Sequence, residues 1–433
     1  MSKDYQKKVA PARTPVLPAA VTVVMAELAA EVQEGLLALA VGTGLQVMAA
    51  MMNADVEAVC GPRGKHDSAR VAVRHGAEAG SVTLGGRRVA VTRPRMRAVD
   101  GSGELSVASY EVFSRTEVLG RMAMERMLAG LSTRAYPVGL EPVGTKVAGS
   151  ARSTSKSAVS RRFVAATQTA LGELLAADLS GLDLVALMID GVHFGEHLCV
   201  VALGIGRDGT KHPLGLAQGS TENTTVVSDL LTGLRERGLD TSRPIFVGID
   251  GGKALHAAVV RVFDHPVIQR CQLHKIRNVA DKLPDHLAAT VTSRMRAAYH
   301  AESAILAQAQ LEALAKELER THPGAAGSLR EGLSETLTVL RLDISPTLAR
   351  TLRSTNAIES MISIARTHSA NVKNWQNGTM ALRWCAAGML EASKQFRRIN
   401  GHLHLPALRT ALDAHIAAHS VGAISHDEPV IAA

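Results

Sequence analysis

The sequence predicts an α/β protein with a mixed sheet flanked by helices, preceded by a mainly helical N-terminal region. Short apolar runs bounded by turn residues lie between residues 184 and 270, which is typical of buried strands. After Cys271 no strand-like run follows for about seventy residues, and Ala, Leu, Glu and Arg predominate, which favours an all-helical segment. At 433 residues the chain has room for roughly two to four domains.

Positive charge is concentrated in one part of the chain. The whole chain carries a net charge of +8, whereas residues 61–164 alone contain 18 Lys or Arg against 8 Asp or Glu, a balance of 18 − 8 = +10. A basic block in a near-neutral chain favours a region that binds a polyanion, with a merely soluble basic surface as the alternative. Aromatic residues make up only 3% of the chain, which argues against a surface that stacks single-stranded bases.

The N-terminal part contains two recognisable patterns. Residues 1–16 have the composition of a disordered segment, and the uncharged stretch 35–52 is interrupted by Gly42 and Gly44, which favours a buried helix pair over a membrane span. Residues 81–94 alternate around a Gly-Gly turn, which predicts a β-hairpin. We expect its exposed positions to carry side chains that contact DNA phosphates, namely Arg87, Arg88, Arg93, Arg95 and Arg97.

A second basic segment follows at residues 150–163. Ser153 or Ser155 is placed to cap a helix, and Val159 and Phe163, four residues apart, would face a core. Two shorter helices are expected before it, so the pattern favours a helix-turn-helix that enters a DNA major groove, with an ordinary surface helix as the alternative. The side chains that would contact DNA are Lys156, Arg161 and Arg162.

Five strands and two helices are expected over residues 184–270. The strands are 184–191, 197–206, 212–217, 245–249 and 267–270, and the helices are 223–236 and 253–263. This order is that of a ribonuclease H-like sheet, in which the first and fourth strands are neighbours, so Asp190 and Asp250 should lie side by side at strand ends. Asp208-Gly209 lies between two strands and is expected to form only a turn.

A third acid, Glu359, lies in a predicted helix at residues 356–369. Two aspartates at strand ends and a glutamate on a helix can converge around a pair of divalent cations, the simplest site for breaking and remaking phosphodiester bonds. In this interpretation Asp190 bridges both ions, while Asp250 and Glu359 each hold one. Ligation by oxygen alone selects Mg²⁺ or Mn²⁺ over Zn²⁺.

Several other polar residues lie close in sequence to these acids. Cys271 and His274 could bind zinc only with two further ligands, which no neighbouring stretch supplies at the usual spacing, so packing beside the site or a phosphate contact by His274 is favoured. Lys253, Lys275 and Arg277 are expected to contact the DNA backbone.

The cysteines and the N-terminus bear on the compartment. The four cysteines are scattered and indicate no disulfide framework, and the first eight residues are polar, without an apolar run at signal-peptide distance. We therefore expect a protein of the reducing cytoplasm, associated with the nucleoid and not with a membrane.

With these residues laid out, the chain resembles the Mutator-type transposases of bacterial insertion sequences. The resemblance runs from about Gly80 to Leu408, and the first sixty residues match poorly. It rests on LGGRRVAVTRPRMR, DGSGELSVASYEVF, MIDGVHF with Asp190, VGIDGGKAL with Asp250, RCQLHKIRNV, RSTNAIESM with Glu359, and RRINGHLHLPAL.

The resemblance implies a ribonuclease H-like core with an Asp-Asp-Glu triad, a helical insertion before the glutamate, and an N-terminal region that binds terminal inverted repeats. It also implies Mg²⁺-dependent cleavage of double-stranded DNA and transfer to target DNA within an oligomer, at least a dimer. The alternatives are a domesticated DNA-binding protein and a nuclease or resolvase that cuts without joining. The expected division of the chain is 1–55, 56–170, 171–275, 276–345, 346–415 and a disordered tail 416–433.

Overall fold

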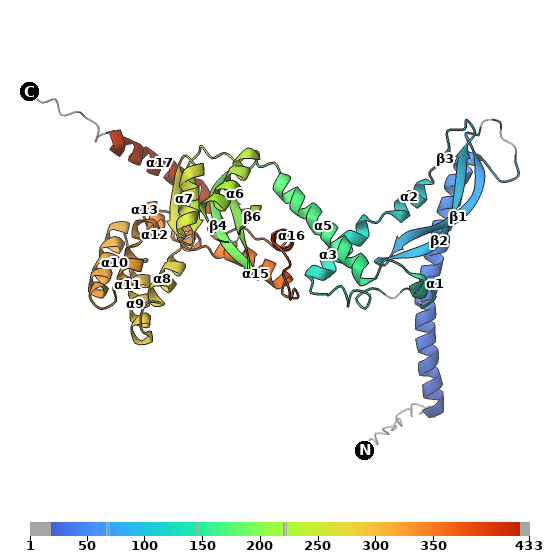
Figure 1. Cartoon of the computed structure of the whole chain (residues 1–433), viewed down its shortest axis with the longest axis horizontal. Helices are drawn as coiled ribbons and strands as arrows, with labels where there is room; N and C mark the ends of the chain where they lie inside the picture. Colours follow the sequence, from blue (N-terminus) through green and yellow to red (C-terminus); the bar gives the residue numbers. More distant parts are fainter. Residues whose placement is uncertain are drawn as a thin grey trace, which may run out of the picture. The chain divides into compact units, whose positions relative to one another are not determined.

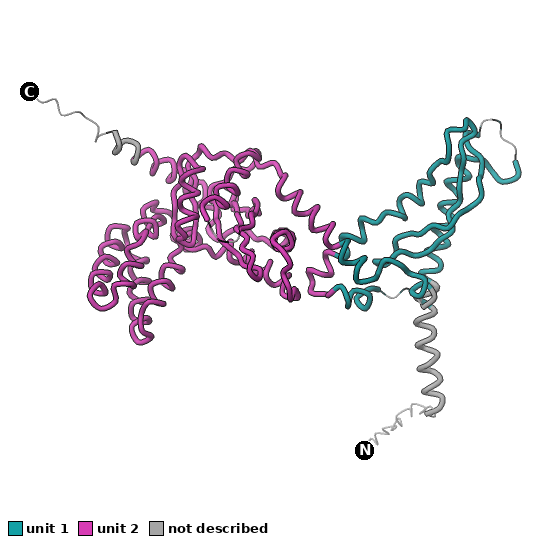
Figure 2. Tube along the Cα trace, viewed as in Figure 1, with its two compact units in different colours: residues 1–123, 133–162 teal, residues 124–132, 163–433 magenta. Residues whose placement is uncertain are grey.

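The computed structural model describes residues 19–65, 68, 70–141, 143, 145–219, 221 and 223–424. The chain divides into two compact units (Figure 2). Unit 1 comprises Met1–Ala123 and Thr133–Arg162, and unit 2 comprises Met124–Ser132 and Phe163–Ala433. The prediction of disorder for residues 1–16 lies outside the described residues. No described helix is both long and apolar enough to cross a lipid bilayer.

Unit 1 is built on a long helix and a three-stranded antiparallel sheet of order β1-β2-β3. Its elements are α1 (Ala19–Cys60), β1 (Ala72–Leu84), β2 (Arg87–Ala98), β3 (Glu104–Leu105), α2 (Ala108–Ser114), α4 (Thr145–Ser150) and the starts of α3 (Glu117–Leu128) and α5 (Lys156–Ala176). The predicted hairpin is confirmed: Leu84 pairs with Arg87 across Gly85 and Gly86. Both glycines have positive φ (53° and 77°), as a two-residue hairpin turn requires.

The predicted buried helix pair at residues 35–52 is wrong. Helix α1 runs through the stretch without a break, because two glycines weaken a helix but do not end it (Figure 1). Its C-terminal turns pack on the sheet through Met52, Val56 and Cys60, whereas Val47 and Met51 are about half exposed. Among the side chains of α1 that the structure describes, the buried ones lie in its C-terminal part.

Unit 2 contains a five-stranded mixed sheet of order β6-β5-β4-β7-β8. The strands are β4 (Leu184–Phe194), β5 (His197–Gly206), β6 (Lys211–Gly219), β7 (Ile245–Ile249) and β8 (Pro266–Arg270), with α6 (Thr224–Glu236) and α7 (Lys253–Val262) between them. The predicted order of strands and helices is confirmed. The first three strands form an antiparallel meander, and β4 pairs in parallel with β7.

Helices cover both faces of this sheet (Figure 1). Along β5, Cys199, Val201 and Leu203 belong to one buried cluster, and Val200 and Ala202 to the other. The first cluster is completed by α15 (Asn356–His368), α16 (Gly378–Ser393) and α17 (Leu405–Ile424), the second by α6 and α7. A strand buried on both faces reads as a continuous apolar run, which is why these strands were predictable.

The segment that follows β8 contains only helices in the described chain. They are α8 (Gln272–Ala280), α9 (Asp285–Ala298), α10 (Ala304–Glu319), α11 (Pro323–Arg330), α12 (Leu333–Thr336), α13 (Thr338–Arg341) and α14 (Pro346–Leu352), and η1 (His402–His404) precedes α17. The first six enclose a core of their own. The side chain of Gln269 on β8 ties it to the sheet, donating to the Thr336 carbonyl (3.0 Å) and accepting from the Val339 N–H (2.9 Å).

The predicted disordered tail at 416–433 is wrong over its first part, since α17 continues to Ile424; residues 425–433 lie outside the described chain.

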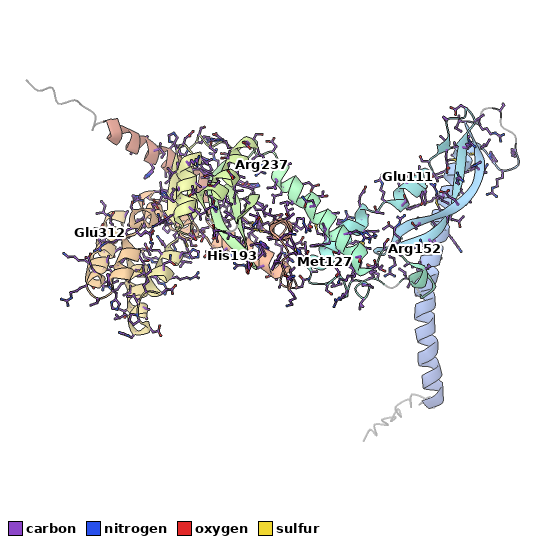
Figure 3. All side chains as sticks on the ribbon, viewed as in Figure 1. Glu111, Met127, Arg152, His193, Arg237 and Glu312 are labelled. Carbon is purple, nitrogen blue, oxygen red and sulfur yellow. The ribbon has the colours of Figure 1, made fainter. Side chains whose placement is uncertain are left out.

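A half-buried arginine joins distant elements of unit 2. Arg237 (labelled in Figure 3) donates to the carbonyl oxygens of Leu174 (2.8 Å) and Leu214 (2.6 Å), which fixes the end of α5 to the β6 edge of the sheet.

Candidate active site

The two aspartates lie on neighbouring strands. The last parallel pair between β4 and β7 is Ile189 with Ile249, and each aspartate is the next residue along the chain. Asp190 does not end its strand, as the sequence suggested, because β4 continues to Phe194 by pairing with β5. The expected juxtaposition holds, since it depends on the parallel pairing and not on where β4 ends.

Backbone N–H groups hold both carboxylates. Asp190 Oδ1 accepts from the Gly191 N–H (2.8 Å), and Asp250 Oδ1 accepts from the Gly252 N–H (2.8 Å). Gly251 has a φ of 110°, a conformation that glycine adopts without strain, and this turn directs the Gly252 N–H back to the carboxylate. The carboxylates are thus oriented by local structure.

Glu359 lies in the first turn of α15. The helix buries Ile358, Met361 and Ile362 against the sheet, which leaves Glu359 half-buried on the adjoining face. The Thr355 hydroxyl donates to Glu359 Oε1 (2.6 Å). Packing and this bond together restrict the glutamate.

The three acids influence one another electrostatically. Burial, together with the charges of Asp250 and Glu359, raises the pKa of Asp190 to about 6, while the Gly191 hydrogen bond and His274 act in the opposite direction. Negative charges that oppose the ionisation of a neighbouring acid raise its pKa in this way. Crowded carboxylates favour a bound cation, because it offsets their mutual repulsion.

Cys271 and His274 join the site from the end of β8 and the start of α8. The Cys271 N–H donates to the Ile249 carbonyl (2.8 Å), and the Gln272 N–H donates to the Arg353 carbonyl (3.0 Å), which draws this turn toward both Asp250 and α15. The possible ligand atoms of Cys271, His274 and Glu359 all lie within 4.8 Å of one another. Sequence spacing gave no sign of this convergence, because Glu359 is far along the chain.

Cys271 and His274 also form a polar pair. The hydrogen bond to Cys271 raises the pKa of His274 to about 9, and the charges of Glu359 and Asp250 act in the same direction. Burial raises the pKa of the Cys271 thiol, but hydrogen bonds to His274 and Thr355 outweigh it and lower the pKa below its ordinary value. A positive imidazole therefore lies beside the acids at neutral pH.

Two of the expected DNA-contacting cations are buried. Arg87 is 6% exposed and donates to the Glu141 carbonyl (2.8 Å), in contrast to its predicted exposed position. Lys275 is 5% exposed and donates to the carbonyl oxygens of Ser328 (2.7 Å) and Glu331 (2.6 Å). Both cations form hydrogen bonds inside the fold, so neither is assigned to DNA.

Four more already have partners within the fold. Arg88 donates to the Ser114 carbonyl (2.5 Å), Arg95 forms an ion pair with Glu104 (2.7 Å), and Arg162 donates to the Ser153 carbonyl (2.6 Å). Arg93 is likewise paired with Glu78. The remaining candidates are exposed or, for His274, half-buried: Arg97, Lys156, Arg161, Lys253, Arg277 and His274.

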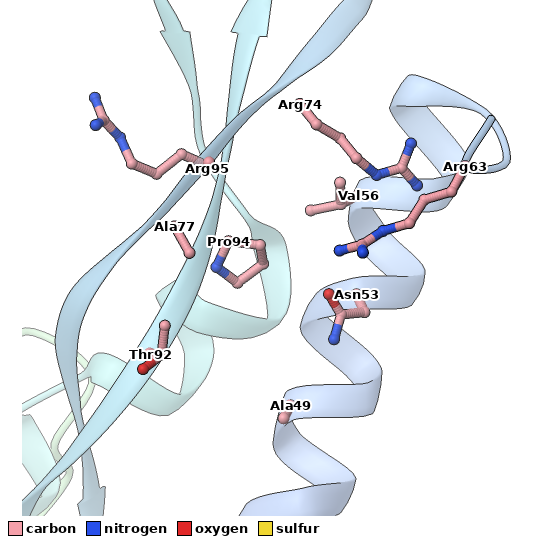
Figure 4. A pocket seen from close by; sticks show the side chains of 10 residues that line it. Ala49, Asn53, Val56, Arg63, Arg74, Ala77, Thr92, Pro94 and Arg95 are labelled. Atoms are coloured by element: carbon pink, nitrogen blue, oxygen red, sulfur yellow. The ribbon is translucent and has the colours of Figure 1, made fainter.

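A hollow of about 530 Å³ lies between α1 and the hairpin of unit 1 (Figure 4). Arg63, Arg74, Arg95 and Asn53 line it. Arg74 donates to the Gly61 carbonyl (2.7 Å) and Arg95 is paired with Glu104, so two of these three guanidinium groups already have partners within unit 1.

A basic groove of about 680 Å³ lies beside α15 in unit 2. Four cations line it, no Asp or Glu is among the described lining residues, and its wall includes Asn356, the first residue of the helix that carries Glu359. Because the groove gathers residues from four separate elements, the sequence did not predict it. The four cations, named here the groove cations, are Lys211, Arg350, Arg397 and Arg398.

Comparison with known proteins gives one consistent result. A transposase for insertion sequence element IS6120 from Mycolicibacterium smegmatis is 29% identical over 287 residues, covering 65% of this chain and 86% of that protein. A transposase for insertion sequence element ISRM5 from Rhizobium meliloti is 26% identical over 316 residues, covering 72% and 77%. The family described as "Transposase, Mutator family" matches residues 20–398, which includes parts of both units. The chain therefore belongs to the Mutator family of transposases.

Proposed function

We propose that this protein is the transposase of an insertion sequence, and that it cleaves DNA at the element's terminal repeats and transfers the strands to target DNA. The observation that carries the proposal is the parallel pairing of the strands that bear Asp190 and Asp250, with Glu359 beside Cys271 and His274 at the end of the next strand, in a chain of this family. The strand order supports a ribonuclease H-like core with the helical segment inserted before Glu359.

The donor set fits Mg²⁺ or Mn²⁺. The three carboxylates offer only oxygen and are partly buried, and burial together with the charges of Asp250 and Glu359 raises the pKa of Asp190. When bound, a pair of such ions activates a water or 3′-hydroxyl and stabilises the leaving oxygen. Asp190, on the strand between β5 and β7, would be a ligand to both ions, and Asp250 and Glu359 would each be a ligand to one.

The surrounding residues hold this arrangement. The Gly191 and Gly252 N–H groups orient the aspartates, and the Thr355 hydroxyl orients Glu359. Because each support is a backbone group or a short side chain, the carboxylates are restricted before any ion binds. His274, which lies beside Glu359, would contact a phosphate oxygen of the DNA.

Phosphate contacts are assigned to cations for which no hydrogen bond inside the described part of the fold is seen. In unit 2 these are the groove cations, Arg277, and Lys253, whose ion pair with Glu331 is long (3.9 Å) and lies at the surface. In unit 1 they are Arg97, Lys156 and Arg161, of which the last two lie in the first turns of α5, capped by Ser155. We propose that α5 and the short α4 read the terminal repeats and that the active protein is at least a dimer.

Incubation of the full chain with end-labelled duplexes of its element termini tests the proposal. Mg²⁺ should give cleavage and joined products, and EDTA should abolish both. Asp190→Asn, Asp250→Asn and Glu359→Gln should each lower the cleavage rate by roughly a thousandfold, because each loses several kcal/mol of metal-borne stabilisation. DNA binding should change little.

Asp208→Asn is the matched control, since Asp208 is also followed by glycine but only accepts from Thr210 in a hairpin turn. Full cleavage by any of the three variants would remove that acid from the site. Cleavage without strand joining would identify a nuclease or resolvase, and binding without cleavage a domesticated DNA-binding protein.

A further inference from the structure

A second set of ligands overlaps the proposed catalytic acids. Cys271, His274 and Glu359 present a sulfur, an imidazole nitrogen and a carboxylate oxygen, all within 4.8 Å of one another. We propose that these three residues bind Zn²⁺ or a similar thiolate-preferring ion. The site would share Glu359 with the Mg²⁺ site and thereby inhibit the enzyme.

The three ligands are held by the fold. The Cys271 N–H donates a hydrogen bond to the Ile249 carbonyl, which fixes the position of this cysteine. His274 follows one helical turn later, so both residues lie at the start of α8. Glu359 projects from the first turn of α15, where the Thr355 hydroxyl binds it and lies 3.5 Å from His274 Nδ1. Two helix starts therefore face each other across a short gap.

The chemistry of the donors separates this site from the catalytic one. Thiolate and imidazole select zinc, whereas Mg²⁺ requires oxygen ligands. Three protein ligands leave one position of a tetrahedral ion open to water, and the three atoms need to move only slightly to reach usual zinc distances of about 2.0–2.3 Å. Cys271 is 1% exposed, while His274 and Glu359 are half-buried, so an ion enters past the latter two.

The inhibitory part of this inference rests on the proposed function. A Glu359 carboxylate that binds zinc together with Cys271 and His274 would not be available to a Mg²⁺ ion held by Asp190 and Asp250. Zinc would then leave the catalytic set with two acids in place of three. Strand cleavage would become sensitive to the balance of zinc and magnesium, without any change in DNA binding.

Cobalt binding by the full chain tests the site without DNA. Co²⁺ replaces zinc and gives a thiolate-to-cobalt charge-transfer absorption only when sulfur is a ligand. The wild-type protein should show this band, Cys271→Ser should lose it, and His274→Gln should bind at least about a hundredfold more weakly. Cys60→Ser, which alters another buried cysteine, and Asp190→Asn, which alters only the catalytic set, should both retain it.

Thermal melting in the presence and absence of zinc guards against misfolded variants. Zinc should raise the melting temperature of the wild type and of Asp190→Asn, but not that of Cys271→Ser or His274→Gln. A charge-transfer band that survives in Cys271→Ser, or zinc stabilisation that survives in both variants, would overturn the site.

The inhibition is measured separately. Added zinc should slow Mg²⁺-dependent cleavage by the wild type at least tenfold more than cleavage by Cys271→Ser. Equal inhibition of the two proteins would overturn the proposal that zinc inhibits cleavage through this site. If no cleavage occurs with Mg²⁺, the proposed function fails while the cobalt spectra still decide the metal site.

Discussion

Asp190 illustrates at the scale of one residue how a proposed catalytic group costs stability. Its folded pKa of about 6 lies above the ordinary value of 3.8, chiefly because the carboxyl is buried and lies beside Asp250. The folded state therefore binds more protons between these pH values than the unfolded state does. The stability that the protonated Asp190 carboxyl contributes below its ordinary pKa of 3.8 is therefore lost as the pH rises through about 6.

Asp190→Asn should therefore melt at a higher temperature than the wild type at pH 7 in the absence of divalent ions. The gain should be on the order of 1–2 kcal/mol after allowance for solvent screening, and should shrink toward pH 4. Melting followed by circular dichroism from pH 4 to 7.5 in EDTA measures it. In Asp208→Asn no such gain should appear, because hydrogen bonds from Thr210 lower the pKa of Asp208. A variant that melts below the wild type at pH 7 would contradict this account.

Single residues differ in how far their positions could be predicted. Asp190 and Asp250 follow apolar runs whose burial is evident from the sequence. The prediction that they lie side by side therefore depended only on the strand order. Arg87 and Lys275 could not be placed in this way. Their partners are main-chain carbonyl groups more than fifty residues away, and a sequence does not show where a carbonyl will need a donor.

At the scale of elements, strand β7 was predicted at its observed bounds, because five apolar residues lie between a proline and Asp-Gly. Strand β4 was predicted too short. Its last residues, Val192 to Phe194, follow an acid and a glycine that read as a turn, yet pairing with Cys199 to His197 keeps them extended. Tertiary pairing thus overrode a local turn signal.

The attachment of α8 to its neighbours yields a prediction at this scale. Lys275→Ala should destabilise unit 2 by roughly 2–3 kcal/mol, because the carbonyl oxygens of Ser328 and Glu331 lose a charged donor in a buried place. Urea denaturation measures the change. Arg277→Ala, on the exposed face of the same helix, should cost less than about 0.5 kcal/mol. Equal stability of the two variants would mean that the Lys275 hydrogen bonds contribute little.

At the scale of the whole molecule, the family match begins at residue 20, well before the resemblance evident from motifs at about residue 80. Motifs reveal positions where chemistry fixes the residue type, and α1 has few such positions. The units divide at three places, within α3, within α5 and between Ser132 and Thr133, and no change of composition marks the two boundaries that fall inside a helix. The groove could not be predicted from the sequence either, because its cations come from β6, α14 and the segment after α16.

The groove yields a prediction for DNA binding by the complete protein. Arg350, Arg397 and Arg398 are exposed and make no ion pair among the described residues, so each is available to a phosphate. The logarithm of the DNA association constant falls linearly with the logarithm of the salt concentration. Replacement of all three arginines by alanine should reduce the steepness of this slope by roughly 0.9 for each DNA phosphate that the variant no longer neutralises. The affinity for element ends and for unrelated duplexes should fall by the same factor, because interactions with the DNA backbone carry no sequence information.

Titrations of a fluorescent duplex at several salt concentrations measure this slope. Arg294→Ala with Arg330→Ala is the matched control, since these exposed arginines are paired with Glu317 and Glu319 on the helical segment. The control should retain the wild-type slope. An unchanged slope in the groove variant would mean that DNA does not occupy the groove, and that Lys253, Arg277 and the cations of unit 1 bind the phosphates without it.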